Sequence, residues 1–262
     1  MSHVVRWYTG SMLNNYNHLI VSDVSENCVV VDPFDPQQAI KEAAKVAKKI
    51  IAILVTHEHR DHYQGAKALS DLTGAQIYAH ISNQTDLPRM DIAVKEGDEL
   101  EFAEDLQLTV LETPGHLKGH VCFYSEADKY IVSGDVLFNA GMGSVRFHSS
   151  SIEALYHSMQ KLSQLPKDVR IYPAHDYFQN NLGFMQNIDS DNQQIPKWLN
   201  KLDQQTPETR ATSTLGDEHE YNLFLNVDKE EAAQKVAKRA GLETLAPGLK
   251  TFKVLRELRD NW

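Results

Sequence analysis

Apolar residues in the first two thirds of the chain fall into short runs of the length and composition that form β-strands. Val, Ile, Leu and aromatic residues dominate these runs, and Gly, Pro, Asn and Asp separate them. One run, Ile50–Val55, is apolar throughout, which is typical of a strand covered on both faces. The expected strands span residues 4–7, 18–22, 28–31, 50–55, 76–79, 92–94, 106–111, 121–124, 130–132 and 169–172.

Amphipathic stretches with helical spacing alternate with these strands, at residues 37–49, 62–72 and 151–162. Because two groups of strands are each followed by helices, we expect an α/β fold with two facing sheets and helices outside, an αββα sandwich. From about Asp176 only helical stretches follow, at residues 180–187, 192–204, 229–240 and 249–259, joined by polar segments 206–210 and 216–218. The pattern predicts an αββα domain over residues 1–175 and a smaller all-helical domain over residues 176–262.

Four side chains that can bind metal ions lie within six residues directly after the strand Ile50–Val55. His57 and His59 point the same way in a loop that leaves a strand, whereas Asp61 and His62 lie one loop turn further on. Imidazoles and carboxylates in such a row suit two neighbouring divalent ions better than one ion that needs all of them. The spacing therefore predicts a two-metal site at this end of the sandwich.

Three further candidate ligands occupy matching places along the chain. His116, Asp135 and His175 each follow a predicted strand, with a small or turn-forming residue just before the candidate. Because strand ends can gather at one edge of a sandwich, we expect these three residues to complete the metal site. His120 lies four residues after His116 and is a candidate to orient a ligand from behind.

The chain has 26 Lys and Arg against 36 Asp and Glu, a formal net charge of −10. This balance argues against nucleic acid or an anionic membrane as the main partner. The N-terminus has no apolar signal segment and no stretch reaches 18 apolar residues, so we expect a cytoplasmic protein, and we expect a monomer. Cys28 and Cys122 lie in strand-like runs and are expected to be buried and reduced.

The motif His57-x-His59-x-Asp61-His62, with His116, Asp135 and His175, resembles the metallo-β-lactamase fold superfamily. Within it, the chain resembles the glyoxalase II, or hydroxyacylglutathione hydrolase, family. The resemblance covers nearly the whole chain, including Asn15-Tyr16-Asn17-His18-Leu19, Val31-Asp32-Pro33, Gly134-Asp135-Val136-Leu137-Phe138, Ser213-Thr214-Leu215, Tyr221-Asn222-Leu223-Phe224-Leu225 and Leu255-Arg256-Glu257-Leu258-Arg259-Asp260.

The resemblance implies one ligand set for each of two divalent ions, with Asp135 bridging them. The first set is His57, His59 and His116, and the second is Asp61, His62 and His175. Zinc is the first expectation, with iron or manganese as alternatives, because a His and Asp set without Cys does not choose among them. The implied reaction is hydrolysis of S-D-lactoylglutathione to D-lactate and glutathione by hydroxide held between the ions, the second step of methylglyoxal detoxification. Asp61 is the catalytic candidate, because it could also hold or accept the proton of the attacking water.

The family also implies residues that bind the glutathione part of the substrate. Basic residues of the last helix and a tyrosine after the last His ligand match Arg256, Arg259 and Tyr177. The loop at residues 141–148 departs from the family pattern, with the basic residue, Arg146, displaced by about two positions. We expect Arg146 to reach a substrate carboxylate from the reshaped loop, and Leu255, Leu258 and Trp262 to turn toward the core.

Two other activities of the superfamily are alternatives: a persulfide dioxygenase with one iron, and another metal-dependent thioester or ester hydrolase. The dioxygenase is expected to lack a long helical C-terminal region. A metallo-β-lactamase proper would usually carry Cys in place of Asp135, and a nucleic-acid-processing relative would need a basic groove. Because all seven candidate ligands are present, a non-catalytic binding protein is the least favoured reading.

Overall fold

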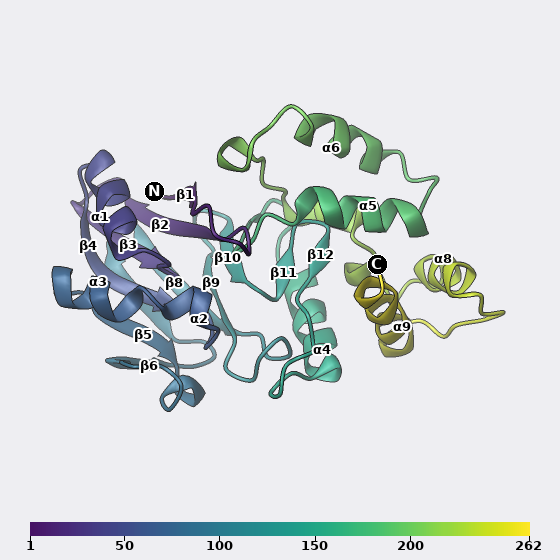
Figure 1. Cartoon of the computed structure of the whole chain (residues 1–262), viewed down its shortest axis with the longest axis horizontal. Helices are drawn as coiled ribbons and strands as arrows, with labels where there is room; N and C mark the ends of the chain where they lie inside the picture. The colour runs from purple at the N-terminus through teal and green to yellow at the C-terminus, as the bar shows by residue number, and fades with distance from the viewer.

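Two β-sheets face each other in the computed structural model, which describes residues 1–262 (Figure 1). The first sheet has the strand order β1-β2-β3-β4-β5-β6. Its strands are β1 (Ser2–Tyr8), β2 (Tyr16–Ser22), β3 (Asn27–Val31), β4 (Lys49–Val55), β5 (Gln76–His80) and β6 (Ile92–Val94). The strands from β1 to β3 pair antiparallel, whereas those from β3 to β6 pair in parallel.

The second sheet has the order β13-β10-β9-β8-β7 and is antiparallel except for the pair of β10 and β13. Its strands are β7 (Glu99–Ala103), β8 (Leu106–Glu112), β9 (Val121–Ser125), β10 (Tyr130–Gly134) and β13 (Arg170–Pro173). A separate hairpin of β11 (Leu137–Phe138) and β12 (Gly141–Met142) follows β10. The hairpin and the ends of β10 and β13 lie next to one another, because β11 contacts both strands.

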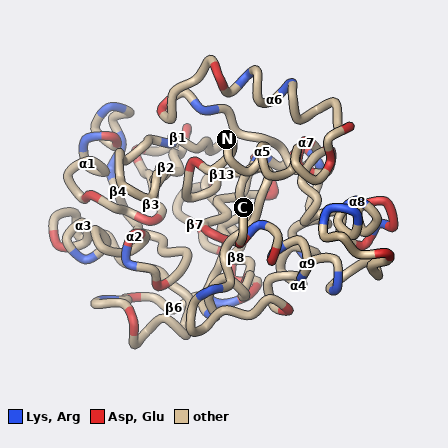
Figure 2. Tube along the Cα trace, turned by 45° about the vertical axis from the view of Figure 1, so that its right-hand side comes forward, with Lys and Arg blue, Asp and Glu red and all other residues tan.

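Helices cover the outer faces of both sheets, as the sequence predicts for an αββα sandwich. The first sheet carries α1 (Pro36–Lys45) and α3 (Ala66–Thr73), and the short α2 (Arg60–Tyr63) follows β4. The second sheet packs against α4 (Ile152–Ser163), whose first turn is capped by Ser151. Basic and acidic positions lie along the outward helices α1, α3 and α8 (Figure 2), so their charged faces meet solvent.

The core forms three apolar layers that follow from the alternation of side chains along the strands. Residues such as Val29, Leu54 and Phe123 fill the space between the sheets. A second cluster, which includes Ile53 and Leu69, lies between the first sheet and its helices. The largest cluster has 29 buried residues and runs from the outer face of the second sheet through α4 into the C-terminal helices. Apolar burial is therefore continuous from the sandwich into the helical region.

The helical region follows β13 and lies beside the β11–β12 hairpin (Figure 1). It contains α5 (Phe178–Ile188), α6 (Gln194–Leu202), α7 (Leu215–Tyr221), α8 (Glu230–Ala240) and α9 (Leu249–Asp260). Three single turns of 3-10 helix lie at Ile81–Asn83, Pro207–Thr209 and Leu223–Leu225. No helix combines the length and the apolar character that crossing a bilayer requires. The division of the chain into two domains at residue 175 stays a prediction.

Several elements differ from the sequence-based prediction. The strands β7, β11 and β12 and the helix α7 were not predicted, and the expected polar connection 216–218 lies inside α7. The expected helix 62–72 is two helices, because Gly65 interrupts it. A Cβ on Gly65 would lie 2.5 Å from the backbone oxygen of Pro33, so the chain turns there against the loop after β3. Cys28 and Cys122 are free and buried, as predicted.

Candidate metal centre

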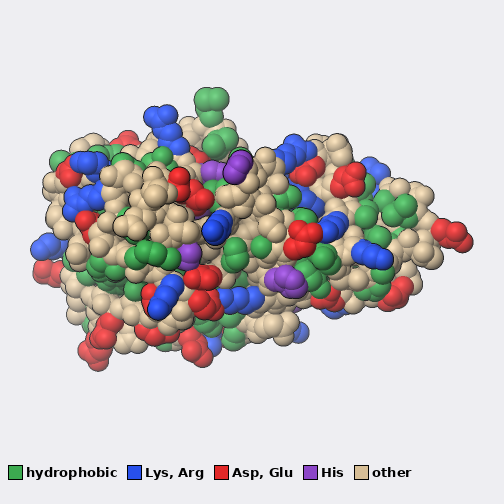
Figure 3. All heavy atoms as spheres, turned by 90° about the horizontal axis from the view of Figure 1, so that it is seen from below, with side chains coloured by type: hydrophobic (Ala, Val, Ile, Leu, Met, Phe, Trp, Pro, Cys, Tyr) green, Lys and Arg blue, Asp and Glu red, His purple; other side chains and the backbone are tan.

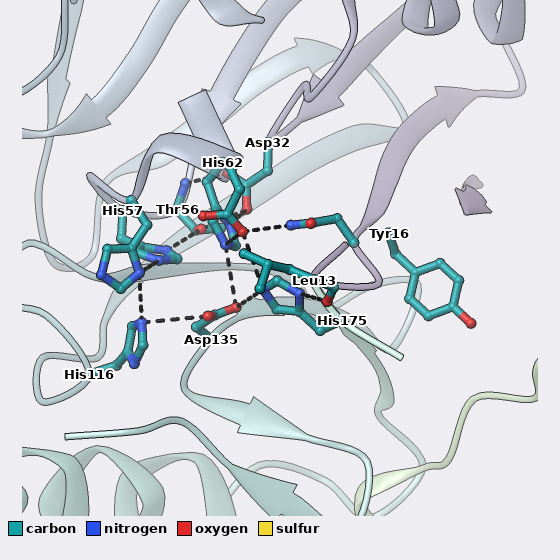
Figure 4. A network of polar contacts seen from close by, with 12 residues as sticks. Leu13, Tyr16, Asp32, Thr56, His57, His62, His116, Asp135 and His175 are labelled. Carbon is teal, nitrogen blue, oxygen red and sulfur yellow. Dashed lines mark hydrogen bonds and ion pairs between the residues drawn. The ribbon is translucent and has the colours of Figure 1, made fainter. Parts of the chain in front are cut away.

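The seven predicted ligands come together at one edge of the sandwich, in segments that follow strand ends. Figure 4 labels five of them: His57, His62, His116, Asp135 and His175. His57 and His59 lie in the segment that joins β4 to α2, and Asp61 and His62 lie in α2 itself. His116 lies between β8 and β9. Asp135 directly follows β10, and His175 follows β13. The gathering of candidate ligands at strand ends, which the sequence pattern suggested, is thus present in the fold.

Two glycines allow the chain to turn just before ligands. Gly134 has φ +49°, and a Cβ on it would lie 2.7 Å from His120 Nε2. Gly115 has φ +138°, and a Cβ there would lie 2.2 Å from the backbone nitrogen of Leu155 in α4. Only glycine fits at these points, so the directions in which His116 and Asp135 leave their strands depend on these glycines.

The first group of candidate ligands is His57, His59, His116 and Asp135. The Nδ1 of His59 lies 3.0 Å from His57 Nε2 and 3.1 Å from His116 Nε2. Asp135 Oδ2 lies 3.5 Å from His116 Nε2. Three imidazole nitrogens and one carboxylate oxygen therefore face a common point.

The second group is Asp61, His62 and His175, with the other oxygen of Asp135 beside it. Asp61 Oδ2 lies 3.4 Å from His62 Nε2 and 3.7 Å from His175 Nε2. Asp135 Oδ1 lies 3.2 Å from His175 Nε2 and 3.6 Å from His62 Nε2. Asp135 thus presents one oxygen to each group, and Figure 4 shows it between His116 and His175.

Groups behind the ligands fix which ring nitrogen carries a proton. His116 Nδ1 donates to the carbonyl of Ser144 at 2.8 Å, and His175 Nδ1 donates to the carbonyl of Leu13 at 2.8 Å. A carbonyl only accepts hydrogen bonds, so the Nε2 atom of each neutral ring has a free lone pair. Both lone pairs are directed into the ligand groups.

Asp32 and Thr56 set the tautomers of two other histidines. The Asp32 carboxylate accepts from His62 Nδ1 at 2.8 Å and from both the backbone nitrogen and the hydroxyl of Thr56, at 2.8 and 2.7 Å. Since the Thr56 hydroxyl donates to Asp32, it accepts from His57 Nδ1 at 3.0 Å. In the neutral rings of His57 and His62, the Nε2 atom therefore also has a free lone pair. Figure 4 shows this network.

Whether the residues fit metal ions can be judged from the surroundings of these lone pairs. His62 Nε2 and Asp135 Oδ1 are buried and have no hydrogen-bond partner. They lie among nitrogen and oxygen atoms that all offer electron pairs, an arrangement that is costly unless a cation neutralises it. Divalent cations are the usual partners of such His and carboxylate sets. The donor set fits two such ions, one for each group.

The pKa values of these groups show that the carboxylates and the imidazoles act strongly on one another. Burial by itself would lower the pKa of His62, but the carboxylates of Asp135 and Asp32 raise it well above its ordinary value. Burial and neighbouring imidazoles hold the pKa of His57 well below its ordinary value. Burial alone would raise the pKa of Asp135, yet His175 and His62 lower it far below that of a free carboxyl. The site therefore attracts positive charge beside Asp135.

His120 lies directly behind two of the candidate ligands. Its Nε2 accepts the backbone N–H of Asp135 at 3.0 Å, and its Nδ1 lies 2.8 Å from the hydroxyl of Thr113. Its ring stacks on that of His57, with centroids 5.0 Å apart and an angle of 29° between the planes. Its place agrees with the orienting role expected from the sequence.

The four predicted substrate-binding residues line one cleft of about 320 Å³ next to the ligands. Arg256 is 6% exposed and donates to the carbonyl of Gly143 at 3.3 Å and to Asp260 Oδ1 at 2.7 Å. Its Nε is buried without a partner, and burial lowers its pKa to about 10. Arg259 donates to Asn180 Oδ1 at 2.8 Å, and Arg146 Nε lies 3.4 Å from Asp260 Oδ1.

Tyr177 joins this cleft to the one above the ligands. Its ring stacks on His175, with centroids 5.0 Å apart and an angle of 2° between the planes. Tyr177, Phe138 and Ser144 line both clefts, so the two spaces share a wall. Burial raises the pKa of Tyr177 to about 12, so its hydroxyl stays protonated at neutral pH. A molecule that spans both spaces would pass beside this tyrosine.

One expectation for the last helix is wrong. Leu255 is fully buried and Leu258 packs against the core, but Trp262 is 50% exposed and lines the cleft with Arg256 and Arg259. Trp262 lies after α9 ends at Asp260, so the helical spacing that predicted a core position no longer applies to it.

No functional role was predicted for Asp32, Thr56 or Asn15, although all three contact candidate ligands. Asn15 Nδ2 donates to Asp61 Oδ2 at 2.8 Å. Asp32 has φ +52° and follows β3 directly before a proline, so it shares the strand-end pattern of the ligands. That pattern was the available signal for Asp32, whereas nothing local marks Asn15 or Thr56.

The family model described as the metallo-beta-lactamase superfamily matches residues 16–175, and the model described as the hydroxyacylglutathione hydrolase C-terminus matches residues 176–262. A protein named hydroxyacylglutathione hydrolase from Polaromonas sp. strain JS666 is 34% identical, and 99% of each chain is covered. One of the same name from Francisella tularensis subsp. novicida is 33% identical, again over 99% of each chain.

A similar fold is found among solved structures. The crystal structure of ETHE1 from Myxococcus xanthus superposes with a TM-score of 0.68 and 20% sequence identity, covering 99% of this chain and 100% of that chain. At this identity the likeness shows the metallo-β-lactamase fold alone.

Proposed function

Because this chain belongs to the hydroxyacylglutathione hydrolase, or glyoxalase II, family of the metallo-β-lactamase superfamily and is a metal-dependent thioester hydrolase, we propose that it hydrolyses S-D-lactoylglutathione. The products are D-lactate and glutathione, which makes the reaction the second step of methylglyoxal detoxification. The observation that carries the proposal is the shared wall of Tyr177, Phe138 and Ser144 between the ligand cleft and the arginine cleft. One thioester can then present its carbonyl to the ligands and its thiol part to the arginines.

The residues that would hold the metals are the two ligand groups. His57, His59 and His116 would bind one ion, and Asp61, His62 and His175 would bind the other. Asp135 presents one oxygen to each group and would contribute to both. Two divalent cations bound there would supply a hydroxide nucleophile near neutral pH and polarise the thioester carbonyl. We propose zinc first, with iron or manganese as alternatives, because the donors are nitrogen and oxygen without sulfur.

Asp61 has a second role in the proposal beyond ligation. Its Oδ2 accepts from Asn15 and faces His62 and His175, and its side chain is 18% exposed at the cleft. Burial alone would raise the pKa of Asp61, but the neighbouring His62 ring and the hydrogen bond from Asn15 lower it below the usual range, so Asp61 is ionised at neutral pH. An ionised carboxylate at the cleft can accept the proton of the attacking water.

The arginine cleft fits the anionic thiol part of the substrate. Arg146, Arg256 and Arg259 face one space, where Asp260 neutralises only part of their charge. Arg256 lines this cleft and has a donor, Nε, that no other group of the protein uses, and guanidinium groups bind carboxylates through paired donors. The Tyr177 hydroxyl adds a neutral donor between the thiol part and the carbonyl.

Other parts of the functional prediction rest on the sequence alone. The monomeric state, the cytoplasmic location and the absence of a nucleic-acid partner stay predictions. Lys and Arg side chains are interspersed with Asp and Glu over the face drawn in Figure 3.

The test combines metal analysis with release of free thiol. Purified protein should contain about two divalent ions per chain and release glutathione from S-D-lactoylglutathione. About one iron per chain, with oxygen uptake on glutathione persulfide and no thioester cleavage, would instead identify a persulfide dioxygenase. Cleavage of simple esters without preference for the glutathione thioester would identify a different hydrolase.

A further inference from the structure

Two large apolar side chains are exposed at the ligand cleft. Phe147 is 44% exposed and Leu13 is 50% exposed, and both line the cleft that contains His59, Asp61, Asp135 and His175. Single exposed apolar residues are common on protein surfaces. Two exposed apolar side chains beside one set of polar ligands are less common, because both are in contact with water when the cleft is empty, which is unfavourable.

The two side chains stand at opposite ends of the ligand row. The Phe147 ring lies 4.3 Å from that of His59 and 5.2 Å from that of His116, between centroids. The Leu13 carbonyl accepts from His175 Nδ1. Asp135 lies between His116 and His175 (Figure 4). Phe147, beside His59 and His116, therefore covers one ligand group, and Leu13 adjoins the other.

Backbone contacts hold both residues in place. The backbone nitrogen of Phe147 donates to Ser150 Oγ at 3.2 Å, and Ser150 Oγ donates to the carbonyl of His116 at 2.6 Å. On the other side, the backbone nitrogen of Asp176 donates to the carbonyl of Asn14, next to Leu13, at 2.9 Å. The backbone at each apolar residue is thus linked to a segment that carries a candidate ligand, and both residues are positioned before a substrate arrives.

The remaining walls divide the cleft into a thiol side and an acyl side. Phe138, Ser144 and Tyr177 are shared with the arginine cleft. Apart from the ligands, the side chains left to meet the acyl group are Leu13, Phe147 and Arg60. Arg60 belongs to α2 and is exposed, so water solvates its guanidinium group whether or not a substrate is bound.

We propose that Leu13 and Phe147 form an apolar acyl site, so that the enzyme favours 2-hydroxyacyl thioesters with longer aliphatic chains over the D-lactoyl thioester. The inference rests on the proposed thioesterase function. An acyl chain that extends from the ligands meets the Leu13 or the Phe147 side chain, and each added methylene group that it lays there removes apolar surface of both partners from water. Each of the first two methylenes then raises kcat/KM roughly threefold, as burial of one CH2 allows.

The test uses the metal-loaded enzyme and glutathione thioesters of D-lactate, D-2-hydroxybutanoate and D-2-hydroxypentanoate. In the wild type, kcat/KM should rise along this series, mainly through KM. Leu13→Ser and Phe147→Ser should each flatten the rise, with unchanged metal content and Tm. Leu72→Ser is the matched control, because Leu72 is 57% exposed in α3 and does not line the cleft.

The outcomes separate this inference from the proposed function. Cleavage of all three thioesters at equal kcat/KM, or a rise that persists in both serine variants, would overturn the acyl site and leave the thioesterase function standing. Failure to cleave any glutathione thioester would overturn both. Stronger cleavage of S-succinylglutathione, lost in Arg60→Ala, would show that Arg60 and not the apolar pair selects the acyl group.

Discussion

The carboxylate of Glu218 accepts the backbone N–H of Ala140 through both of its oxygens, at 2.8 and 3.1 Å. Ala140 lies in the turn between β11 and β12, and Glu218 lies in α7. Three more donors, from Ser213, Tyr221 and Asn222, complete the surroundings of this fully buried carboxyl group. The hairpin that carries Phe138 and Met142, two walls of the arginine cleft, is thereby fixed to the helical region.

Replacement of Glu218 by alanine should strongly destabilise the protein. Four buried donors would lose their acceptor, and each unsatisfied group costs about 1–3 kcal/mol. We expect Glu218→Ala to lower the free energy of unfolding by about 3 kcal/mol or more, measured by urea denaturation. Glu220→Ala, an exposed neighbour in the same helix, should change it by less than about 0.5 kcal/mol. Equal effects of the two substitutions would contradict the role of the carboxylate.

The same carboxyl group should make stability depend on pH. Burial raises the pKa of Glu218 from 4.5 to about 7, although its four hydrogen-bond donors lower it. A raised pKa in the folded state gives stability that is complete below about pH 4.5 and is lost as the pH rises through about 7. The free energy of unfolding of the wild type, relative to Glu218→Gln, should therefore fall by about 3 kcal/mol from pH 4.5 to pH 8. A constant difference across this range would refute the raised pKa.

Asp135 should be needed for both metals. Because its two oxygens face the two ligand groups, Asp135→Ala removes a donor from each. We expect the purified variant to lose metal and thioesterase activity together, as measured by elemental analysis and thiol release. Asp168→Ala, at an exposed position, is the matched control. A variant that retains both ions would rule out the bridging role.

Asp32 should affect metal affinity without touching the ions. Its carboxylate holds His62 Nδ1 and, through Thr56, the tautomer of His57. Asp32→Asn can place an N–H where His62 needs an acceptor. Loss of a carboxylate that hydrogen-bonds to a metal-binding histidine typically weakens metal affinity by about 10- to 100-fold. Chelator competition should show a loss of this order, whereas Asp23→Asn, half exposed beside His3, should show none. An unchanged affinity would mean that Asp32 serves only the fold.

Arg256 should contribute to binding rather than to chemistry. It lies in the arginine cleft, away from the ligand groups, so its contact is made equally in the ground state and the transition state. Arg256→Ala is expected to raise KM roughly tenfold or more, with a much smaller change in kcat. Lys250→Ala, an exposed residue of the same helix, should leave both constants unchanged. A change confined to kcat would remove the substrate-binding role.

The sequence predicts those parts of the fold and site that local patterns encode. The apolar run of β4 and the ligands at strand ends are visible in the chain, because a buried strand and a turn residue each leave a local trace. The edge strand β7 alternates Glu99 and Glu101 with half-buried residues, so its pattern is too polar to read as a buried strand. The helix α7 was not predicted because Gly216 favours a turn, although Thr214 and Asp217 form a capping box at the start of the helix.

Contacts between distant segments account for the rest. The carbonyl of Leu13 and the amide of Asn15 meet their ligands only after the first sheet has formed, and no spacing rule marks them. Trp262 lies beyond the end of its helix, where periodicity has no meaning. The tautomers of His57 and His62 depend on one carboxylate, Asp32, which lies 24 and 30 residues from its partners Thr56 and His62.

The hydrogen bond between Leu13 and His175 also has a consequence for synthesis of the chain. It joins residues 162 positions apart, and Tyr16 donates from its backbone to the carbonyl of Ala174 beside it. Closing so long a loop costs conformational entropy, and only the contacts of the sheets between its ends offset that cost. The second ligand group therefore cannot be complete before His175, just after β13, has been synthesised, and an ion that needs all of its side chains could bind only then.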